Sequence, residues 1–495
     1  MAPRDPKTRT SLIALAVAAL AALASTSMAA TAPARRQGVA PAAAMPALPS
    51  PQRPAGCTDD DSPEQKSAPA NTNANANANA GAAATRGTPA PTGVDPRNAR
   101  LNLLALVQAA IRRSNQVGAA RLLAEAANSD IDEVRAANLP TINATAGIGA
   151  IDAGAVNAET TKGGQYTAGV NMSAPLWDGG RNNELTGWRT HLAEAARFGE
   201  LSTQEQVALQ TVSLALERSR YGVESQVYEQ YARKMGCLVD ALQIIVSADH
   251  GRTSELVQAR KTQQQAELMR DQSLSQRRLA EVRLRRFIGD GAPVPGEGIT
   301  SVMLETPPLP DLLTMAGRAN EIQQLGSQAD ALDSYVRAVL DGQKPQLGWL
   351  VSLTKSAGST NSRSLGGTVT INVPLFNPSS TYTVSSARKR AEAARLQVAD
   401  ALEARQSRMK EVHEQALHAM DRARHVVEIL HNSDQVRNFT IQQWQQLGRR
   451  SLFDVMAAEA DHYNMRVQYV DALYDTQQSN ALLWSLGLGL AVHLE

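Results

Sequence analysis

The sequence predicts a mainly α-helical protein that also carries membrane β-strands and is built from one unit that occurs twice. Three observations predict this fold class. A proline-bounded pair of alternating segments recurs in the second half of the chain, a helical pattern precedes each pair, and a long proline-free tract follows each pair. Self-similarity of this kind indicates a repeat architecture. We therefore expect a duplicated helix, β-hairpin and long-helix repeat.

The N-terminal residues 1–29 have the pattern of a secretory signal peptide. Arg4, Lys7 and Arg9 precede a short apolar run, and Ser27-Met28-Ala29 provides a cleavage site of small residues. The apolar run is too short for a comfortable transmembrane helix, although an uncleaved anchor is the alternative. We expect an exported protein.

Residues 30–97 are rich in Ala, Pro and Asn, and the sequence predicts that this segment is disordered. Such a composition buries too little apolar surface to offset the entropy of ordering the chain. Cys57 lies in this segment and Cys237 lies in helical sequence, so we expect two unpaired thiols.

The first copy of the repeat covers residues 98–289, and its alternating segments predict strands at about 141–151 and 166–176. The following tract has no proline up to Gly289 and must reverse near Gly251. Even one helix of about 50 residues would span about 75 Å. A globular core does not need that length, whereas a structure that crosses the periplasm does.

The second copy covers residues 311–495 and predicts strands at about 347–355 and 365–375. Residues 290–310, rich in Pro and Gly, form either a linker or an equatorial segment around the helices. In the last helix, apolar residues recur at alternating spacings of three and four, which predicts a coiled-coil seam. The seam positions are Phe453, Met456, Ala460, Tyr463, Val467, Val470, Tyr474, Gln477, Ala481 and Trp484.

Each predicted strand has one apolar face and one face of uncharged polar residues. Ile142 and Ile148 alternate with Asn143 and Thr145, and the other strands follow the same rule, with Leu350 as the exception. A half-buried strand of a soluble sheet gives the same pattern. Repetition in four strands with aromatic residues near their ends favours strands between lipid and water. The predicted interface aromatics are Tyr166, Trp177, Trp349 and Phe376.

A sheet of four strands cannot close into a wide barrel, and an open sheet edge in lipid would leave backbone groups unpaired. Other copies of the chain must therefore complete the sheet. Three copies would supply about twelve strands, a number that encloses a channel. An exported chain with such strands and no apolar helical anchor fits the outer membrane of a diderm bacterium, with the helices in the periplasm.

Composition and motifs argue against catalysis and nucleic-acid binding. The 49 Lys and Arg residues balance the 48 Asp and Glu residues, whereas nucleic-acid binding usually needs a basic surplus. His413, His418 and His425 share one helix without the spacing of a metal pair. No phosphate-binding loop, zinc motif or nucleophile motif occurs, so we expect no enzyme, no cofactor and no bound metal.

A five-residue motif ends both hairpins. It reads Ala-Pro-Leu-Trp-Asp in the first copy, ending at Asp178, and Val-Pro-Leu-Phe-Asn in the second, ending at Asn377. Together with the long helices and the turn 448–455, this motif resembles the TolC family of outer-membrane channel proteins. The resemblance covers about 101–495. It implies a homotrimer with a twelve-stranded β-barrel in the outer membrane, continued by a periplasmic α-helical barrel.

The same resemblance implies that the chain is the exit duct of a tripartite efflux pump or of a type I secretion system. A periplasmic adaptor and an inner-membrane transporter of the ABC or RND type would be its partners. The alternative is a structural coiled-coil protein that spans the envelope without a conducting pore, for which a trimer without conductance would be the sign.

The resemblance also implies a gate at the periplasmic helix tips. By motif position Arg450 matches the gate arginine and Asp454 the first acid of the constriction, while Ala457 and Gln445 depart from the family pattern. Glu255 is the nearest acid beyond the turn of the first copy. Copies of one acid around an axis would repel one another and attract cations. The alternative to a gate role is that Asp454 is a surface acid near a helix N-terminus, where the helix dipole favours it, and that Arg450 is an ordinary solvated residue.

Overall fold

A computed structural model describes residues 96–494, with gaps at 154–160, 249, 291–301, 360, 448–449 and 488. All of them belong to one compact unit, Asp59–Glu495. The predicted signal peptide 1–29, the predicted disordered segment up to residue 95 and most of the predicted linker lie outside the described residues.

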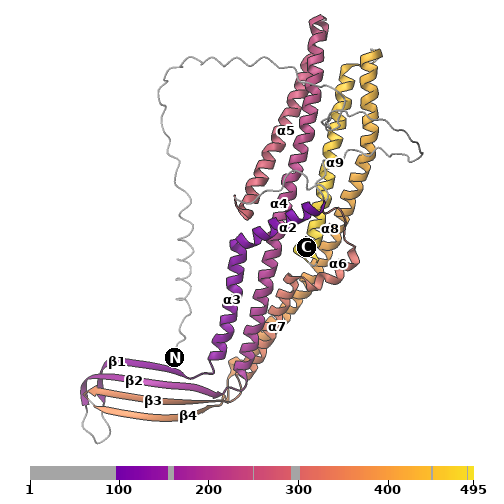
Figure 1. The fold of residues 1–495 in the computed structure, drawn as a ribbon. Helices are drawn as coiled ribbons and strands as arrows, with labels where there is room; N and C mark the ends of the chain where they lie inside the picture. Colours follow the sequence, from indigo (N-terminus) through magenta and orange to yellow (C-terminus); the bar gives the residue numbers. More distant parts are fainter. Residues whose placement is uncertain are drawn as a thin grey trace, which may run out of the picture. The chain divides into compact units, whose positions relative to one another are not determined.

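The fold is mainly α-helical and consists of two copies of a helix, β-hairpin and long-helix unit, so the predicted fold class is confirmed (Figure 1). The first copy contains α2 Pro96–Arg113, α3 Asn115–Ala136, β1 Thr141–Ala153, β2 Thr161–Trp177, α4 Arg181–Ala248, η1 His250–Arg252 and α5 Thr253–Ile288. The second copy contains α6 Leu309–Met315, η2 Ala316–Arg318, α7 Asn320–Asp341, β3 Gln346–Gly358, β4 Ser362–Asn372, α8 Pro378–Leu447, α9 Leu452–Leu486 and α10 Leu490–Leu494.

The two β-hairpins join into one antiparallel sheet with the strand order β1-β2-β3-β4. The pairing of β2 with β3 joins the two copies, and it places Val170 opposite Leu353. A β-bulge between Pro175 and Trp177 shifts the register at the helix-proximal end of β2, because proline cannot donate a ladder hydrogen bond.

The last residue of the motif, Asp178 or Asn377, caps the start of each long helix with its side chain. The carboxylate of Asp178 accepts hydrogen bonds from the backbone N–H groups of Gly180 at 3.0 Å and Asn182 at 2.6 Å. In the second copy the side-chain oxygen of Asn377 accepts from the N–H of Ser379 at 3.2 Å. Side-chain acceptors satisfy the N–H groups that a helix start leaves unpaired. The motif therefore converts strand into helix in both copies.

The long helices α4 and α8 contain 68 and 70 residues, which corresponds to about 100 Å each at 1.5 Å per residue. Each turns back at the end away from the sheet, α4 through η1 into α5 and α8 into α9 (Figure 1). Within the described part of the chain, no helix is both long and apolar enough to cross a membrane.

The main hydrophobic core lies along α4, between α5 on one side and α9 on the other. On the predicted seam of α9, Tyr463 stacks on Tyr231 with ring centroids 4.9 Å apart, and the Tyr474 hydroxyl hydrogen-bonds to Ser219 at 2.7 Å. Phe453 is exposed, so the predicted seam is wrong at its first position. The reason is that Phe453 lies in the first turn of α9, where the helix reaches the tip.

Two further segments bear on expectations from the sequence. Asn480 donates its side-chain amide to the carbonyl of Met303 at 2.9 Å, so the described end of the inter-copy segment packs against α9. Cys237 on α4 is disulfide-bonded, and the expectation of an unpaired thiol is therefore wrong for this residue. Periodicity in sequence contains no signal for such a bond, while Cys57 lies outside the described residues.

Candidate functional site

The sheet has one apolar and one polar face, and the register carries each face across all four strands. On the apolar face the aligned rows include Ile142, Met172 and Val351, then Ala144, Val170, Leu353 and Leu365. On the polar face they include Asn143, Asn171, Ser352 and Gly366, then Thr145, Gly169, Thr354 and Ser364. Such alternation suits a sheet with lipid on one side and water on the other.

The predicted interface aromatics lie toward both ends of the sheet. Tyr166 pairs with Ala357 at the hairpin end, while Trp177 pairs with Leu347 at the helix end. Trp349 is half-buried beside Ala174 in the register. Phe376 lies in the connection between β4 and α8, and its side chain is almost fully exposed.

The edge strands β1 and β4 have a described sheet partner on one side only. Unpaired backbone groups are not tolerated in the hydrocarbon core of a membrane. A single copy of this sheet is therefore incomplete in lipid, and strands from other copies are the simplest means of closing it.

At the turn from α8 to α9, the structure brings Arg450 close to Asp454. A guanidinium nitrogen of Arg450 lies 3.9 Å from the Asp454 carboxylate, and its Nε donates to the side-chain oxygen of Gln443 at 3.2 Å. Both charged side chains are about half exposed, 54% and 46%. An exposed pair at this distance is weak, so both groups are available to solvent or to another chain.

Asp454 also caps the N-terminus of α9, because it is the N3 residue of that helix. The Ser451 hydroxyl accepts from the Asp454 N–H at 3.3 Å, and the Asp454 carboxylate accepts from the Ser451 N–H at 3.2 Å. This reciprocal pair is a capping box. The two readings of Asp454 from the sequence, constriction acid and helix-terminal acid, are therefore compatible in one side chain.

Glu255 lies in the first turn of α5, at the turn of the first copy. One of its carboxylate oxygens is 4.0 Å from the Arg252 guanidinium. Among the described residues, no hydrogen bond or ion pair joins Glu255 to Arg450 or Asp454. Within one protomer the predicted gate residues therefore form two separate groups, one at the helix turn of each repeat copy.

A charge network that the sequence reading missed connects the two copies midway along the helices. Arg220 of α4 lies 2.9 Å from Asp471 and 3.3 Å from Asp475, both on α9. It also pairs with Glu224 of its own helix at 2.9 Å. The i,i+4 spacing within each pair was visible in the sequence, but the pairing of α4 with α9 was not.

Electrostatics in this network favour a protonated carboxyl group. Burial is the main cause that raises the pKa of Glu224, to about 7, with a hydrogen bond to Asp471 adding to it and Arg220 opposing it. Burial also lowers the pKa of Arg220, but Asp471 and the other carboxylates outweigh burial and raise it. Arg220 therefore stays charged while Glu224 titrates near neutral pH.

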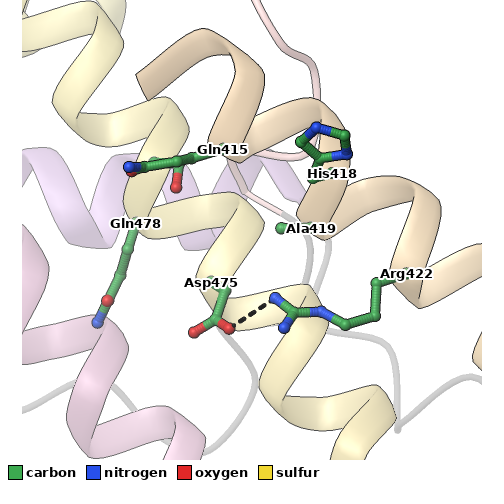
Figure 2. Close-up of a pocket in the computed structure, with 7 residues that line it drawn as sticks. Gln415, His418, Ala419, Arg422, Asp475 and Gln478 are labelled. Carbon is green, nitrogen blue, oxygen red and sulfur yellow. Dashed lines mark hydrogen bonds and ion pairs between the residues drawn. The ribbon is translucent and has the colours of Figure 1, made fainter. Parts of the chain in front are cut away.

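On the α8 side the network ends in a groove between α8 and α9 with a volume of about 480 Å³. Figure 2 shows Arg422 reaching from α8 to Asp475 on α9, an ion pair of 3.0 Å. The other polar residues of the lining are Gln415, His418, Gln478 and Ser479. In the described part of the chain, no cluster of His, Cys, Asp and Glu is suited to hold a metal ion.

Comparisons with known proteins agree with this architecture. Residues 106–290 match the family model of the outer membrane efflux protein family. The fold is similar to that of CusC, with a TM-score of 0.71 and 15% identity over 79% of this chain and 92% of that one. No curated protein sequence matches the chain.

Two further solved structures share the fold. The outer membrane protein VceC from Vibrio cholerae has a TM-score of 0.68 and 15% identity over 79% of this chain and 97% of that one. The CmeC outer membrane channel from Campylobacter jejuni has a TM-score of 0.66 and 14% identity over 82% of this chain and 91% of that one. The family match thus covers less than half of the chain, while most of the chain shares the fold of these outer-membrane channels.

Proposed function

We propose that the chain acts as a homotrimer whose sheets close into one β-barrel of about twelve strands and whose helices form a periplasmic tunnel. The observation that carries this proposal is the two-faced sheet continuous with helices of 68 and 70 residues. The apolar face contacts lipid, the polar face lines the water-filled pore, and the edges β1 and β4 pair between copies.

The tunnel is gated at the helix tips, where Arg450 and Asp454 line the constriction at the turn from α8 to α9. Their exposure and their weak mutual contact support this role, because both charged side chains stay accessible to solvent and to other protomers. Symmetry brings three Asp454 carboxylates toward one axis, which favours cations. Glu255 contributes from the other helix turn.

The duct receives its substrate from an inner-membrane transporter of the ABC or RND type through a periplasmic adaptor. Channels of the outer membrane efflux protein family, whose model matches residues 106–290, work with such partners. The chain conducts the substrate outward, as the exit duct of an efflux pump or of a type I secretion system.

Single-channel conductance in planar bilayers, measured with the oligomer mass in the same detergent, tests the proposal. We expect a trimer with a small conductance that prefers cations. A trimer that never conducts, even when transporter and adaptor are co-expressed, would favour the structural envelope-spanning protein instead. A soluble monomer would contradict the membrane assignment of the sheet.

A further inference from the structure

The apolar face of the sheet carries two basic side chains directly opposite each other. Lys355 of β3 and Arg363 of β4 are paired in the register. Lys355 shares its face with Trp349, Val351 and Leu353, because successive strand residues point to opposite faces. Both basic side chains are exposed. They interrupt a face that is mainly apolar.

Among the described residues, no acidic side chain neutralises either charge. Ala168 is the residue opposite Lys355 on the other neighbouring strand, β2. In the part of the chain that the structure describes, no ion pair involves Lys355 or Arg363. A third cation of this face, Lys162 on β2, is opposite Asp152 in the register. The unpaired positive charge of the face is therefore concentrated on β3 and β4.

The free-energy cost of a charge in lipid limits how deep in the membrane Lys355 and Arg363 can lie. An Arg or Lys on the lipid face is strongly destabilising at the bilayer midplane but costs little near the interface. Leu347, the register partner of Trp177, lies on the same strand as Lys355. Eight residues separate them, or about 26 Å along the strand and about 20 Å along the membrane normal at the usual tilt.

That height places Lys355 and Arg363 at the upper border of an apolar band of about 25 Å. Tyr166, opposite Ala357, lies on the same border, where interface aromatics are expected. The border lies at the hairpin ends, away from the long helices (Figure 1). Because the helices extend into the periplasm, the pair faces the outer leaflet.

We propose that Lys355 and Arg363 form a binding site for the phosphate groups of lipid headgroups in the outer leaflet. A guanidinium can hold a phosphate with two parallel hydrogen bonds, and the lysine adds a mobile point charge. Both long stems can lie along the apolar face while the charged ends reach the headgroups. Basic clusters at a membrane surface attract anionic lipids in this manner.

The occupant is a phosphorylated glycolipid, anchored by its acyl chains on the apolar face below the pair. Arg363 lies on the edge strand β4, so the site borders the seam with the next protomer. Bound lipid would then cover the junction between copies. This inference rests on one part of the proposed function, namely that the sheet lies in the outer membrane. It does not require that the channel conducts.

The test compares wild-type protein with K355Q/R363Q and with the charge-preserving K355R/R363K. The matched control is K389Q/R390Q, which removes one exposed Lys and one exposed Arg from α8. Native mass spectrometry counts the glycolipid retained per trimer after purification. We expect at least threefold less retained glycolipid for K355Q/R363Q, and wild-type retention for the control and for K355R/R363K.

Thermal stability in detergent with added bisphosphorylated glycolipid gives the second measurement. The wild type should gain several degrees, with little gain from the dephosphorylated glycolipid, a zwitterionic phospholipid or inorganic phosphate. Equal retention by wild type and K355Q/R363Q, or an equal gain from the dephosphorylated form, would overturn the site. A full gain from inorganic phosphate would overturn the lipid assignment. Conductance of the same samples distinguishes this failure from failure of the channel.

Discussion

The carboxyl group of Glu224 shows how one buried residue can make the helical bundle sensitive to pH. Burial beside Asp471 raises its pKa to about 7. Because this folded-state value lies above the ordinary value of 4.5, folding favours the protonated form. The stabilising contribution is complete below the ordinary value and is lost as the pH rises through 7.

Glu224→Gln should remove this dependence. Between about pH 5 and pH 8 the thermal midpoint of the wild type should fall relative to that of the variant, because only the wild type must place a charge there. Thermal unfolding at several pH values measures the difference. Glu125→Gln, at an exposed i,i+4 pair, is the control. Parallel curves for wild type and E224Q would contradict the raised pKa.

Asp454 combines a helix cap with a charge at the proposed constriction, and two substitutions separate these tasks. Asp454→Asn keeps an acceptor for the Ser451 N–H but removes the charge, so cation preference and block by multivalent cations should decrease while stability changes little. Asp454→Ala should lose both the charge and the N3 half of the capping box, at a stability cost of about 0.3–1.5 kcal/mol. Unchanged selectivity in both variants, measured as reversal potential in planar bilayers, would remove Asp454 from the constriction.

At this scale the sequence reveals candidate residues better than it reveals their contacts. The turn that contains Arg450 and Asp454 stands out by its motif, and their closeness follows from i,i+4 spacing in a helical start. The network of Arg220 with Asp471 requires two helices from different copies to lie side by side. No local pattern encodes the relative rotation of two long helices, so the partners of Arg220 were not predictable.

Among the elements, the strands make the strongest prediction about the membrane. Val170 lies on the apolar face and its neighbour Asn171 on the polar face. Val170→Lys should hinder assembly by about 2–4 kcal/mol, because it places a charge in the hydrocarbon region, whereas Asn171→Lys should assemble normally. The fraction of heat-resistant trimer in purified outer membranes measures the effect.

Equal tolerance of the two lysines would mean that the sheet does not face lipid. The pair is a sharp test because the positions are adjacent and both substitutions add the same side chain. A soluble half-buried sheet would also reject Lys at Val170, but a trimer extracted only by detergent distinguishes the two situations.

The element scale also explains where sequence reasoning fails. Period-2 alternation predicted both hairpins because each strand has two distinct environments. The seam of α9 was recognised from its spacing, yet Phe453 is exposed because the pattern does not say where packing ends. The strand-to-helix motif was recognised as a repeat, while its mechanism, capping by Asp178 and Asn377, required coordinates.

For the whole molecule, the proposed opening of the tunnel would require helices of one copy of the repeat to move against those of the other. Arg220 on α4 binds Asp471 and Asp475 on α9, and Asp475 in turn binds Arg422 on α8 (Figure 2). This chain of charges therefore connects the first-copy helix α4 to both long helices of the second copy. A clamp in this position would resist relative movement of the helix pairs.

Arg220→Gln removes the cation at the centre of this clamp. Glu224 and Asp471 would then lose their cation, while Asp475 keeps Arg422. Removing one partner of a partly buried ion pair is destabilising because the remaining carboxylates are left close together without a cation. The variant should unfold at lower temperature and conduct more than the wild type in planar bilayers, because α4 and α9 separate more easily. Arg424→Gln, which removes an exposed cation paired only within α8, should change neither quantity. A destabilised variant with wild-type conductance would mean that the network holds the fold but takes no part in the movement that opens the tunnel.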